Sequence, residues 1–466
     1  WVTDGSAHEL KGIPVGEYVI KEISAPEGYL TNLYGIKFKI EYNSDYTGYT
    51  ITYTNDDFLI EDNNMVDELI PLLSTKAWFI EGIKNHAAEV VTITDEVSYE
   101  GVIVNHPYLM VGEIVDKETG TVLATAQKEF TPTNYKGTVN VTFADFDAST
   151  LEGKEIVVYE TLYRTDRYHE ATESTDDNNK IAEHKELTDE DQTLRFPKIG
   201  TTAVSEDDST KLINANGTIK IVDTVKYEVL KTDIEYTIKG TLYDKETGEK
   251  LLVNGSEVTA ETKFTPTTSN GTVDITFEFD ASGLEGKSLV AFEKLFENDI
   301  QIAHHEDIDD EGQTVYAPKL RTTAIDKSSN THVLTMDESS VIVDTVKYEN
   351  VIPNLTYVVK ASLVYKNGEE VTDYTTTAVE FVPTETSGSV DVELTVKSKL
   401  LIESEVVVFE ELYLKNTDTN EEVKKGEHTD VDDTEQTIYV PKIKTKATAE
   451  DGTKEVFPSE EVTIID

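Results

Sequence analysis

The phrase P-x-[IL]-x-T-x-A occurs four times in this chain, and its spacing constrains the fold more than any other feature of the sequence. The copies begin at Pro71, Pro197, Pro318 and Pro441, roughly 120 residues apart, which matches a whole domain rather than one unit of a solenoid. Between them run segments that alternate apolar and polar residues, are rich in Val, Ile, Thr and Tyr, and are separated by Gly, Asn and Asp. The sequence therefore predicts an all-β protein, with tandem Ig-like (Greek-key) β-sandwich domains in an elongated stalk.

The repeated phrase also predicts where the domains begin and end. We expect a partial domain over residues 1–57, a linker over 58–70, three full repeats over 71–196, 197–317 and 318–440, and the start of a truncated fourth repeat over 441–466. The full repeats are called repeats 1, 2 and 3 below. The joints between them are short and contain Pro, which favours a stiff string of domains over a flexible one.

Composition excludes several classes of function. The chain has 466 residues, 91 acidic against 41 basic, and a net charge of −50, so we expect no nucleic-acid partner and no insertion into a membrane. No apolar run approaches the roughly 20 residues of a membrane-spanning helix. There is no Cys, so disulfides are excluded, and we expect no metal or other cofactor. Because both ends lie within patterned sequence, we interpret the chain as a fragment of a longer extracellular protein.

The first part of the chain carries a different motif. The pattern G-[IL]-P-x-G-x-Y-x-[IL]-x-E-x-x-A-P-x-G-Y, which begins at Gly12, resembles the Cna protein B-type (CnaB) domain of Gram-positive surface proteins. The resemblance implies that Glu22 assists an isopeptide bond and that Asn55 is its acceptor amide. The strand that supplies the Lys in that family would precede Trp1, so no such bond is assigned within this chain. The alternative for Glu22 is a half-buried strand carboxylate paired with a Lys.

Three polar residues recur in the same order within every repeat. A Glu follows a run of apolar residues, and a His and a Gln-Thr pair come after it, with seven residues between His and Gln. The residues are Glu160, His184 and Gln192 in repeat 1, Glu293, His305 and Gln313 in repeat 2, and Glu410, His428 and Gln436 in repeat 3. Period-two alternation puts each Glu on the core face, where a carboxylate is costly unless it is protonated or paired.

An early strand carries a further polar residue. The phrase V-D-T-V-K-Y places Thr224 in repeat 2 and Thr345 in repeat 3 near the start of the domain, whereas each Gln lies near its end. If the first and last strands lie side by side, the Thr hydroxyl faces the Gln amide, with the His nearby to take its proton. Attack with loss of ammonia would leave an ester cross-link. A structural hydrogen-bond network is the alternative interpretation.

The complete order of motifs is D-T-V-x-Y, L-x-D-K-x-T-G, V-[AV]-F-E, H-x7-Q-T and P-K-[IL]-x-T-x-A, and it resembles the VaFE-repeat domains. These include the Thr–Gln (T-Q) ester-bond domains of Gram-positive cell-surface adhesins. The resemblance implies the following roles in repeat 2: Thr224 as nucleophile, Gln313 as acceptor, His305 as proton-transfer residue, and Glu293 and Asp244 as assisting acids. In repeat 3 it implies Thr345, Gln436, His428 and Glu410, but the match is incomplete there, because Tyr365 stands where Asp244 would be.

Repeat 1 departs from this pattern. It keeps Asp116, Glu160, His184 and Gln192, but Glu96 stands at the position of Thr224. A carboxylate cannot replace the attacking hydroxyl, and Thr94 would be displaced by about 6–7 Å, two strand rises. We therefore expect a vestigial site in repeat 1, with no cross-link or with one in a shifted register.

We interpret the chain as the structural stalk of a Gram-positive, cell-wall-anchored adhesin or pilus-like protein, stiffened by autocatalytic ester cross-links, and not as a turnover enzyme. The implied partners are a host or neighbouring-cell ligand, bound through a domain outside the fragment, and peptidoglycan, bound through a missing C-terminal region. One alternative is a ligand-binding β-sandwich for glycan or host protein, for which repeat 1 is the candidate because of Glu96 and the insert over 164–180. The other is a set of accessory domains of a secreted glycan-active enzyme.

Overall fold

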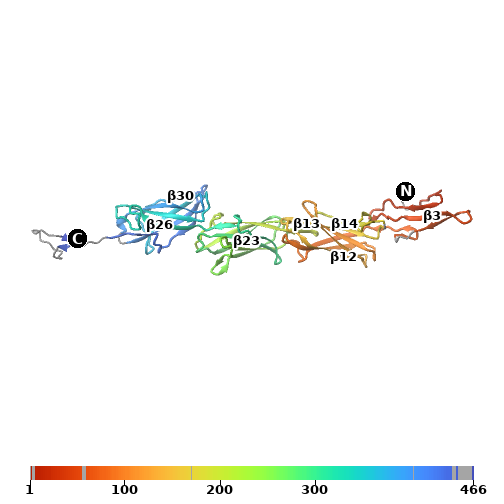
Figure 1. The fold of residues 1–466 in the computed structure, drawn as a ribbon, viewed down its shortest axis with the longest axis horizontal. Helices are drawn as coiled ribbons and strands as arrows, with labels where there is room; N and C mark the ends of the chain where they lie inside the picture. The colour runs from red at the N-terminus through yellow and green to blue at the C-terminus, as the bar shows by residue number, and fades with distance from the viewer. Residues whose placement is uncertain are drawn as a thin grey trace.

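The computed structural model describes residues 2, 6–54, 59–168, 170–401, 404–442, 448–449 and 464–465. An N-terminal domain and repeats 1, 2 and 3 follow one another along the long axis of the molecule (Figure 1). The prediction of an all-β fold is confirmed, since the described helices are two 3-10 turns, η1 (Asp177–Asn179) and η2 (Ser398–Leu400). Among the described residues no helix is long and apolar enough to cross a membrane.

Repeat 1 is a sandwich of two antiparallel sheets. One sheet has the strand order β12-β9-β8, and the other has the order β11-β10-β13-β14, with β15 pairing further along β13. The chain crosses from one sheet to the other after β9, after β11 and after β12, as in Ig-like folds. The strands are β8 (Leu72–Phe79), β9 (Val90–Glu100), β10 (Tyr108–Asp116), β11 (Val122–Phe130), β12 (Lys136–Asp147), β13 (Lys154–Arg164), β14 (Lys180–His184) and β15 (Thr193–Phe196).

Repeats 2 and 3 have the same architecture. The strands of repeat 2 are β16 (Lys198–Ser205), β17 (Thr218–Glu228), β18 (Tyr236–Asp244), β19 (Leu252–Val253), β20 (Ser256–Glu257), β21 (Thr259–Phe264), β22 (Gly271–Asp280), β23 (Ser288–Glu297), β24 (Ile300–His305) and β25 (Thr314–Tyr316). Those of repeat 3 are β26 (Lys319–Asp326), β27 (Ser340–Glu349), β28 (Tyr357–Tyr365), β29 (Tyr374–Thr376), β30 (Val379–Phe381), β31 (Gly388–Val396), β32 (Glu405–Lys415), β33 (Glu422–His428) and β34 (Thr437–Tyr439). Two short strands, β35 (Thr448–Ala449) and β36 (Ile464–Ile465), pair with each other after repeat 3.

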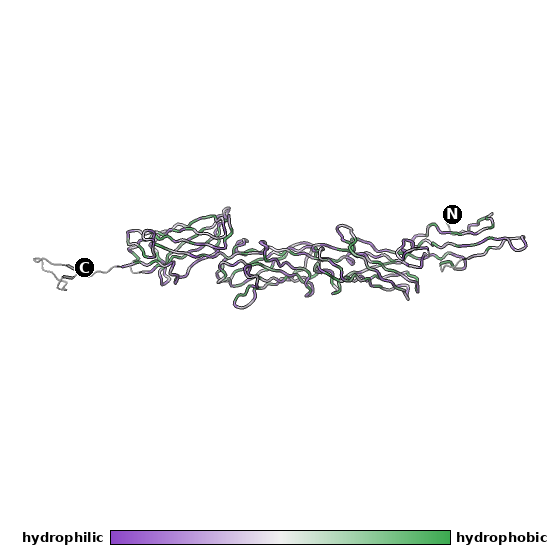
Figure 2. The backbone as a smooth tube through the Cα atoms, in the orientation of Figure 1, coloured by the Kyte–Doolittle hydropathy of each residue, from purple (hydrophilic) through white to green (hydrophobic). Residues whose placement is uncertain are grey.

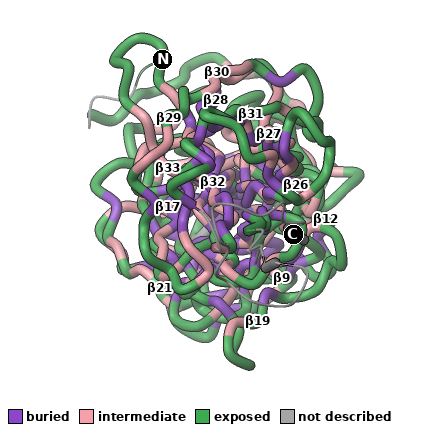
Figure 3. The backbone as a smooth tube through the Cα atoms, turned by 90° about the vertical axis from the view of Figure 1, so that its left-hand side faces the viewer, coloured by how far each residue is buried: buried purple, intermediate pink, exposed green. Residues whose placement is uncertain are grey.

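Alternation along each strand builds the cores. In β17 the side chains of Ile221, Asp223, Val225 and Tyr227 are buried, whereas those between them are half-buried or exposed. Figure 2 shows the same alternation of hydrophobic and hydrophilic residues along the strands, and Figure 3 shows the buried residues gathered near the long axis. Asp223 is thus a carboxylate at a core position of β17, between the apolar Ile221 and Val225.

The N-terminal domain is smaller. It contains β1 (Gly16–Ile20), β2 (Tyr29–Leu30), β3 (Ile36–Tyr42), β4 (Tyr49–Tyr53), β5 (Ile60–Glu61), β6 (Asn64–Met65) and β7 (Glu68–Leu69), with a sheet of order β1-β3-β4. The segment that we interpreted as a linker packs against this domain, because β7 pairs with β2 and Leu59 joins Tyr34 in a small apolar cluster.

The insert over 164–180 contacts the N-terminal domain. The Tyr34 hydroxyl donates to the backbone oxygen of Asp166 at 2.6 Å, and Arg167 donates to the backbone oxygen of Thr31 at 2.9 Å. Arg164 is fully buried and pairs with Glu68. These contacts place the insert in the joint that precedes repeat 1.

Candidate functional site

Two carboxyl groups and an amide meet inside repeat 2. Asp223 in β17 and Glu293 in β23 come from opposite sheets, and both side chains are 0% exposed. The Gln313 side chain, also fully buried, donates from Nε2 to Oε2 of Glu293 at 2.7 Å. The backbone holds this amide in place, because Ala291 N donates to the Gln313 carbonyl oxygen at 3.2 Å.

The electrostatics of the pair follow from burial. Desolvation raises the pKa of Glu293 well above its usual value, and the facing Asp223 raises it further because two nearby negative charges repel. Desolvation also raises the pKa of Asp223. Neither oxygen of Asp223 has a conventional hydrogen-bond donor within the described part of the chain. Burial and mutual repulsion therefore favour the protonated form of this pair of carboxyls.

The hydroxyl at this site belongs to Thr201, in the first strand of the repeat. Thr201 is buried in β16, close enough to both carboxyls for its hydroxyl to offset part of the rise in their pKa values that burial causes. Its Oγ1 makes no well-formed hydrogen bond to any residue that the structure describes. The first strand lies beside the closing segment, since Ala203 N donates to the backbone oxygen of Gly312 at 3.0 Å, one residue before Gln313.

The structure does not bring the predicted nucleophiles to this site. Thr224 lies on the outer face of β17 and donates to Asp274 Oδ1 at 2.8 Å, and Thr345 donates to Asp391 Oδ1 at 2.7 Å. The prediction that these two hydroxyls face the Gln amides is therefore wrong. Successive side chains of a strand point to opposite faces, so a buried Asp223 forces Thr224 outward.

Repeat 1 contains the complete set of residues. Thr75, Asp95, Glu160 and Gln192 are all buried, and the Gln192 amide donates to Glu160. Glu96 and Thr94 lie on the outer face of β9, where Glu96 is opposite Lys76 in register. Repeat 1 therefore does have a buried hydroxyl beside its carboxyls, that of Thr75, although Glu96 stands at the position of Thr224.

Repeat 3 has the same arrangement. Gln436 Nε2 donates to Oε2 of the fully buried Glu410 at 2.5 Å, and Asp344 is the second buried carboxyl. Thr322 is the buried hydroxyl in the first strand. The second acid is therefore present, so the presence of Tyr365 in place of an Asp does not weaken the site.

Each His is held by an Asp that the sequence analysis did not single out. His305 Nε2 lies 2.9 Å from Asp310 Oδ2, and the same contact joins His184 to Asp189 and His428 to Asp433, at 2.9 Å in both. Asp310 Oδ1 accepts from Gly312 N at 2.7 Å, which fixes the turn before Gln313. Although burial opposes it, these hydrogen bonds hold the pKa of Asp310 below its usual value. An Asp five residues after each His was the signal in the sequence.

Comparison with protein families shows which family has domains of this kind. The model described as the T-Q ester bond containing domain matches residues 73–196, 197–317 and 318–440, which is most of the chain. The chain belongs to this family. At the T-Q site of each domain, a buried Thr of the first strand and a pair of buried carboxyls thus lie with a Gln and an Asp-bound His. Residues 1–57 match the model for a prealbumin-like fold domain.

Two predicted acids lie outside these T-Q sites. Asp244 binds Lys287 and accepts from Glu246 N at 3.0 Å, so that it caps the turn after β18. Asp116 does the same in repeat 1, with Lys154 at 3.2 Å. The prediction that Asp244 assists the chemistry is wrong, because its carboxylate is committed to a turn and a Lys.

The CnaB-like residues are described only in part. Glu22 Oε2 accepts from Asn32 N at 2.7 Å, so its partner is a backbone amide rather than a Lys side chain. Asn55 lies outside the described residues. Across the part of the chain that the structure describes, no group of His, Asp or Glu side chains is arranged to hold a metal ion.

Solved structures show only distant likeness to the chain. A bacterial adhesin from Mobiluncus mulieris that contains disulfide, isopeptide and ester bond cross-links is 17% identical, with 46% of this chain and 81% of that chain covered and a TM-score of 0.25. A marsupial T cell receptor is 11% identical, with 77% and 100% covered and a TM-score of 0.26. A Salmonella alpha-2-macroglobulin is 9% identical, with 89% and 26% covered and a TM-score of 0.24. A comparison with curated protein sequences found no match.

Proposed function

We propose that the chain is part of the stalk of a bacterial surface adhesin and that each T-Q domain closes with an intramolecular Thr–Gln ester. The bonds would join Thr75 to Gln192, Thr201 to Gln313, and Thr322 to Gln436. The observation that carries the proposal is the recurrence of the same buried Thr, carboxyl pair and Gln in all three domains. Membership in the T-Q ester bond family supports it.

The chemistry can be written for repeat 2 with every atom accounted for. Oγ1 of Thr201 attacks Cδ of Gln313, and its proton passes to His305. The C–N bond of the amide then breaks, the nitrogen takes the proton from the imidazole, and ammonia leaves. An ester between Oγ1 and Cδ remains, so the protein loses one molecule of ammonia and needs no oxidant, cofactor or second substrate.

The carboxyl pair supports the step in which negative charge develops. The Gln313 Oε1 atom has no hydrogen-bond donor within the described chain, and neither has Glu293 Oε1. Because burial raises the pKa of Glu293 and so favours its protonated form, a carboxylic acid can donate to the oxygen of the tetrahedral intermediate. The same exclusion of water protects the finished ester from hydrolysis.

The Asp–His pair moves the proton. The contact of Nε2 of His305 with Asp310 orients the ring, and the other ring nitrogen would accept the proton of the attacking hydroxyl. The reaction occurs once per domain, so the protein is not a turnover enzyme.

The setting of the proposal is a Gram-positive, cell-wall-anchored protein. Domains outside this chain would bind a surface ligand and would attach the protein to peptidoglycan. A chain without Cys that carries covalent ties of this kind suits the cell exterior, where they do the work of disulfides.

Intact-protein mass spectrometry tests the proposal. The folded chain is expected to have lost three molecules of ammonia. Thr201→Val should restore one of them, and the matched control Thr224→Val should restore none, because Thr224 faces outward. An unmodified mass for the folded wild-type chain would overturn the ester chemistry and leave buried hydrogen-bond networks.

A further inference from the structure

A short segment beside each site also forms the joint to the next repeat. In repeat 1 this joint segment is residues 84–86, and in repeat 2 it is residues 211–213. Each pairs in parallel with the closing strand that follows the acceptor Gln. Arg195 N donates to Lys84 O at 3.0 Å, and Tyr316 N donates to Lys211 O at 2.7 Å. The joint segment therefore holds the strand that carries the amide.

The first residue of each joint segment reaches the acceptor turn itself. Lys84 Nζ donates to the backbone oxygen of Asp191, immediately before Gln192, at 2.5 Å. Lys211 Nζ donates to the backbone oxygen of Gly312, immediately before Gln313, and to that of Ala203 at 2.6 Å. Each Lys thus ties the acceptor turn in place, and Lys211 also ties it to the strand that carries the attacking hydroxyl.

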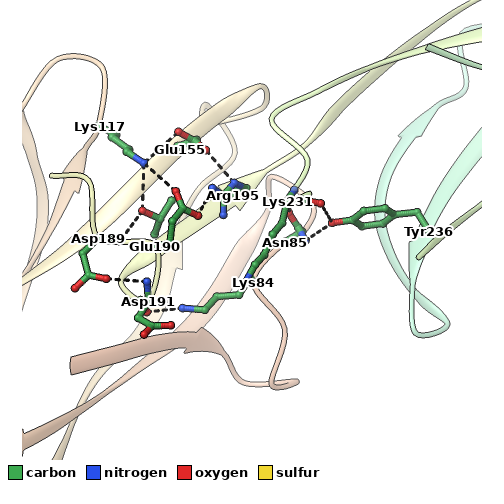
Figure 4. A network of polar contacts seen from close by, with 11 residues as sticks. Lys84, Asn85, Lys117, Glu155, Asp189, Glu190, Asp191, Arg195, Lys231 and Tyr236 are labelled. Atoms are coloured by element: carbon green, nitrogen blue, oxygen red, sulfur yellow. Dashed lines mark hydrogen bonds and ion pairs between the residues drawn. The ribbon is translucent and has the colours of Figure 1, made fainter. Parts of the chain in front are cut away.

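The second residue is held by the following repeat. Asn85 is fully buried, and its Nδ2 donates to Glu297 Oε2 at 2.7 Å and to the Tyr236 hydroxyl at 2.9 Å, both in repeat 2. Lys231 N of repeat 2 donates to its Oδ1 at 3.3 Å. Figure 4 shows Asn85 between Lys231 and Tyr236, with Lys84 pointing the opposite way, toward Asp191.

In the joint between repeats 2 and 3, the following repeat also holds the second residue of the joint segment, but through apolar packing and a Lys. Leu212 is fully buried in the apolar cluster of repeat 3. Its backbone oxygen accepts from Lys425 Nζ of repeat 3 at 2.7 Å, and Lys425 also pairs with Asp208 at 2.9 Å. By contrast, the equivalent Val333 of repeat 3 is 46% exposed.

We propose that each following repeat completes the cross-linking site of the repeat before it. Docking of repeat 2 on Asn85 positions Gln192, and docking of repeat 3 on Leu212 positions Gln313, so ester formation in a repeat follows the folding of its C-terminal neighbour. Lys84, Lys211, Asn85 and Lys425 are positioning residues, because they act through the backbone of the acceptor turn. This inference rests on the proposed ester chemistry.

The test follows ester formation in each repeat of the full chain. The chain is made by cell-free synthesis, samples are quenched with acid over time, and the cross-linked peptides of the three repeats are quantified by mass spectrometry. Asn85→Leu introduces the residue that repeat 2 has at this position, and it should slow the Thr75–Gln192 bond by roughly tenfold while leaving the other two at wild-type rates. Lys425→Met should slow only the Thr201–Gln313 bond.

Controls separate positioning from folding. Resistance to protease shows that every repeat of each variant is folded, and Lys425→Arg, which keeps a donor for the Leu212 carbonyl, should recover most of the rate in repeat 2. Equal rates in wild type and variants, equal slowing of all three bonds, or identical behaviour of the Met and Arg variants would overturn the inference. Absence of ammonia loss from the wild-type chain would instead overturn the ester chemistry itself.

Discussion

Asp223 and Glu293 face each other from opposite sheets of repeat 2 with no exposure to solvent, and the amide of Gln313 donates to one of them. Asp95 with Glu160 and Asp344 with Glu410 repeat the relationship in the other domains. Burial and mutual repulsion raise the pKa of the pair, so each folded domain keeps a proton over a range of pH in which the unfolded chain has already released it.

The retained proton predicts how stability depends on pH when the cross-links are absent. Burial raises the pKa of both acids above their unfolded values, so the unfolded state binds fewer protons as pH rises. The variant to use has Thr75, Thr201 and Thr322 all changed to Val, so that no cross-link forms. In it, each carboxyl pair contributes fully to the free energy of unfolding below the unfolded pKa of Glu, about 4.3. That contribution is lost as the pH rises toward the higher pKa of the folded state. The expected slope is about 1.4 kcal/mol per pH unit for each proton.

Urea unfolding between pH 4 and pH 8 measures this slope. The chain's excess of acidic residues also weakens the fold as pH rises, so the comparison is with the same variant carrying Glu293→Gln, which should show a smaller slope. Equal slopes in the two proteins would contradict a retained proton.

The Asp–His contact predicts a rate effect in one repeat only. His305→Ala should slow ester formation in repeat 2 by about 10²–10⁴-fold, because the attacking hydroxyl then loses its base. Asp310→Ala should slow it less, since the His remains but loses the 2.9 Å contact that orients it. Repeats 1 and 3 of the same molecules are the internal controls, and an unchanged rate in repeat 2 would remove His305 from the mechanism.

The cross-link itself predicts a stability difference between two neighbouring hydroxyl-bearing positions. Thr201→Val removes the bond that closes a loop of more than 100 residues, which corresponds to about 4–5 kcal/mol on the chain-entropy model. Thr224→Val removes only an exposed contact with Asp274 and should be nearly neutral. Hydrogen exchange of the β17 amides reports on repeat 2 alone, and similar protection in the two variants would count against an ester at Thr201.

The close packing of Gly240 against Phe277 predicts that a substitution at one of them can be compensated at the other. Gly240 is opposite Glu293 in register, and a Cβ at Gly240 would lie 2.5 Å from Phe277 Cζ. Gly240→Ala should destabilise repeat 2 by about 1–3 kcal/mol through overpacking. Adding Phe277→Leu should recover much of the loss, because repeat 3 combines Ala361 with Leu394 at these positions.

Thermal unfolding of the variants measures both effects. Gly200→Ala is the matched control, because a Cβ there has no heavy atom within 4 Å. If Gly240→Ala were as mild as Gly200→Ala, the contact with Phe277 would not limit the size of this residue.

The period-two pattern was sufficient to predict the sheets and the burial of Glu160, Glu293 and Glu410. The same pattern also shows why Thr224 could not be the buried hydroxyl. Ile221, Asp223 and Val225 share one face, so the acid rather than the Thr had to point inward. The core-facing hydroxyl was in the phrase used only to mark domain boundaries, where Thr201 lies between Ile199 and Ala203 on the buried face.

The joints could not be predicted in this way. Asn85 and Glu297 are 212 residues apart in the sequence. In the next joint Leu212 takes the place of Asn85, and its partner Lys425 lies on β33, whereas Glu297 ends β23. Local pattern carries no information on such contacts, because they depend on how two finished domains dock. The Asp that binds each His could have been predicted from its constant spacing, but other acidic residues of variable position surround it in each repeat.

The positions of Thr201 and Gln313 near the two ends of repeat 2 determine how the molecule responds when it is stretched. A bond between them leaves only the few residues near Pro197 and Ala317 outside the closed ring. The residues from 202 to 312 would then be removed from the contour available to a pulling force, which amounts to roughly 370 Å of hidden length per repeat at full extension. A tether built this way keeps almost the same reach whether its domains are folded or unfolded.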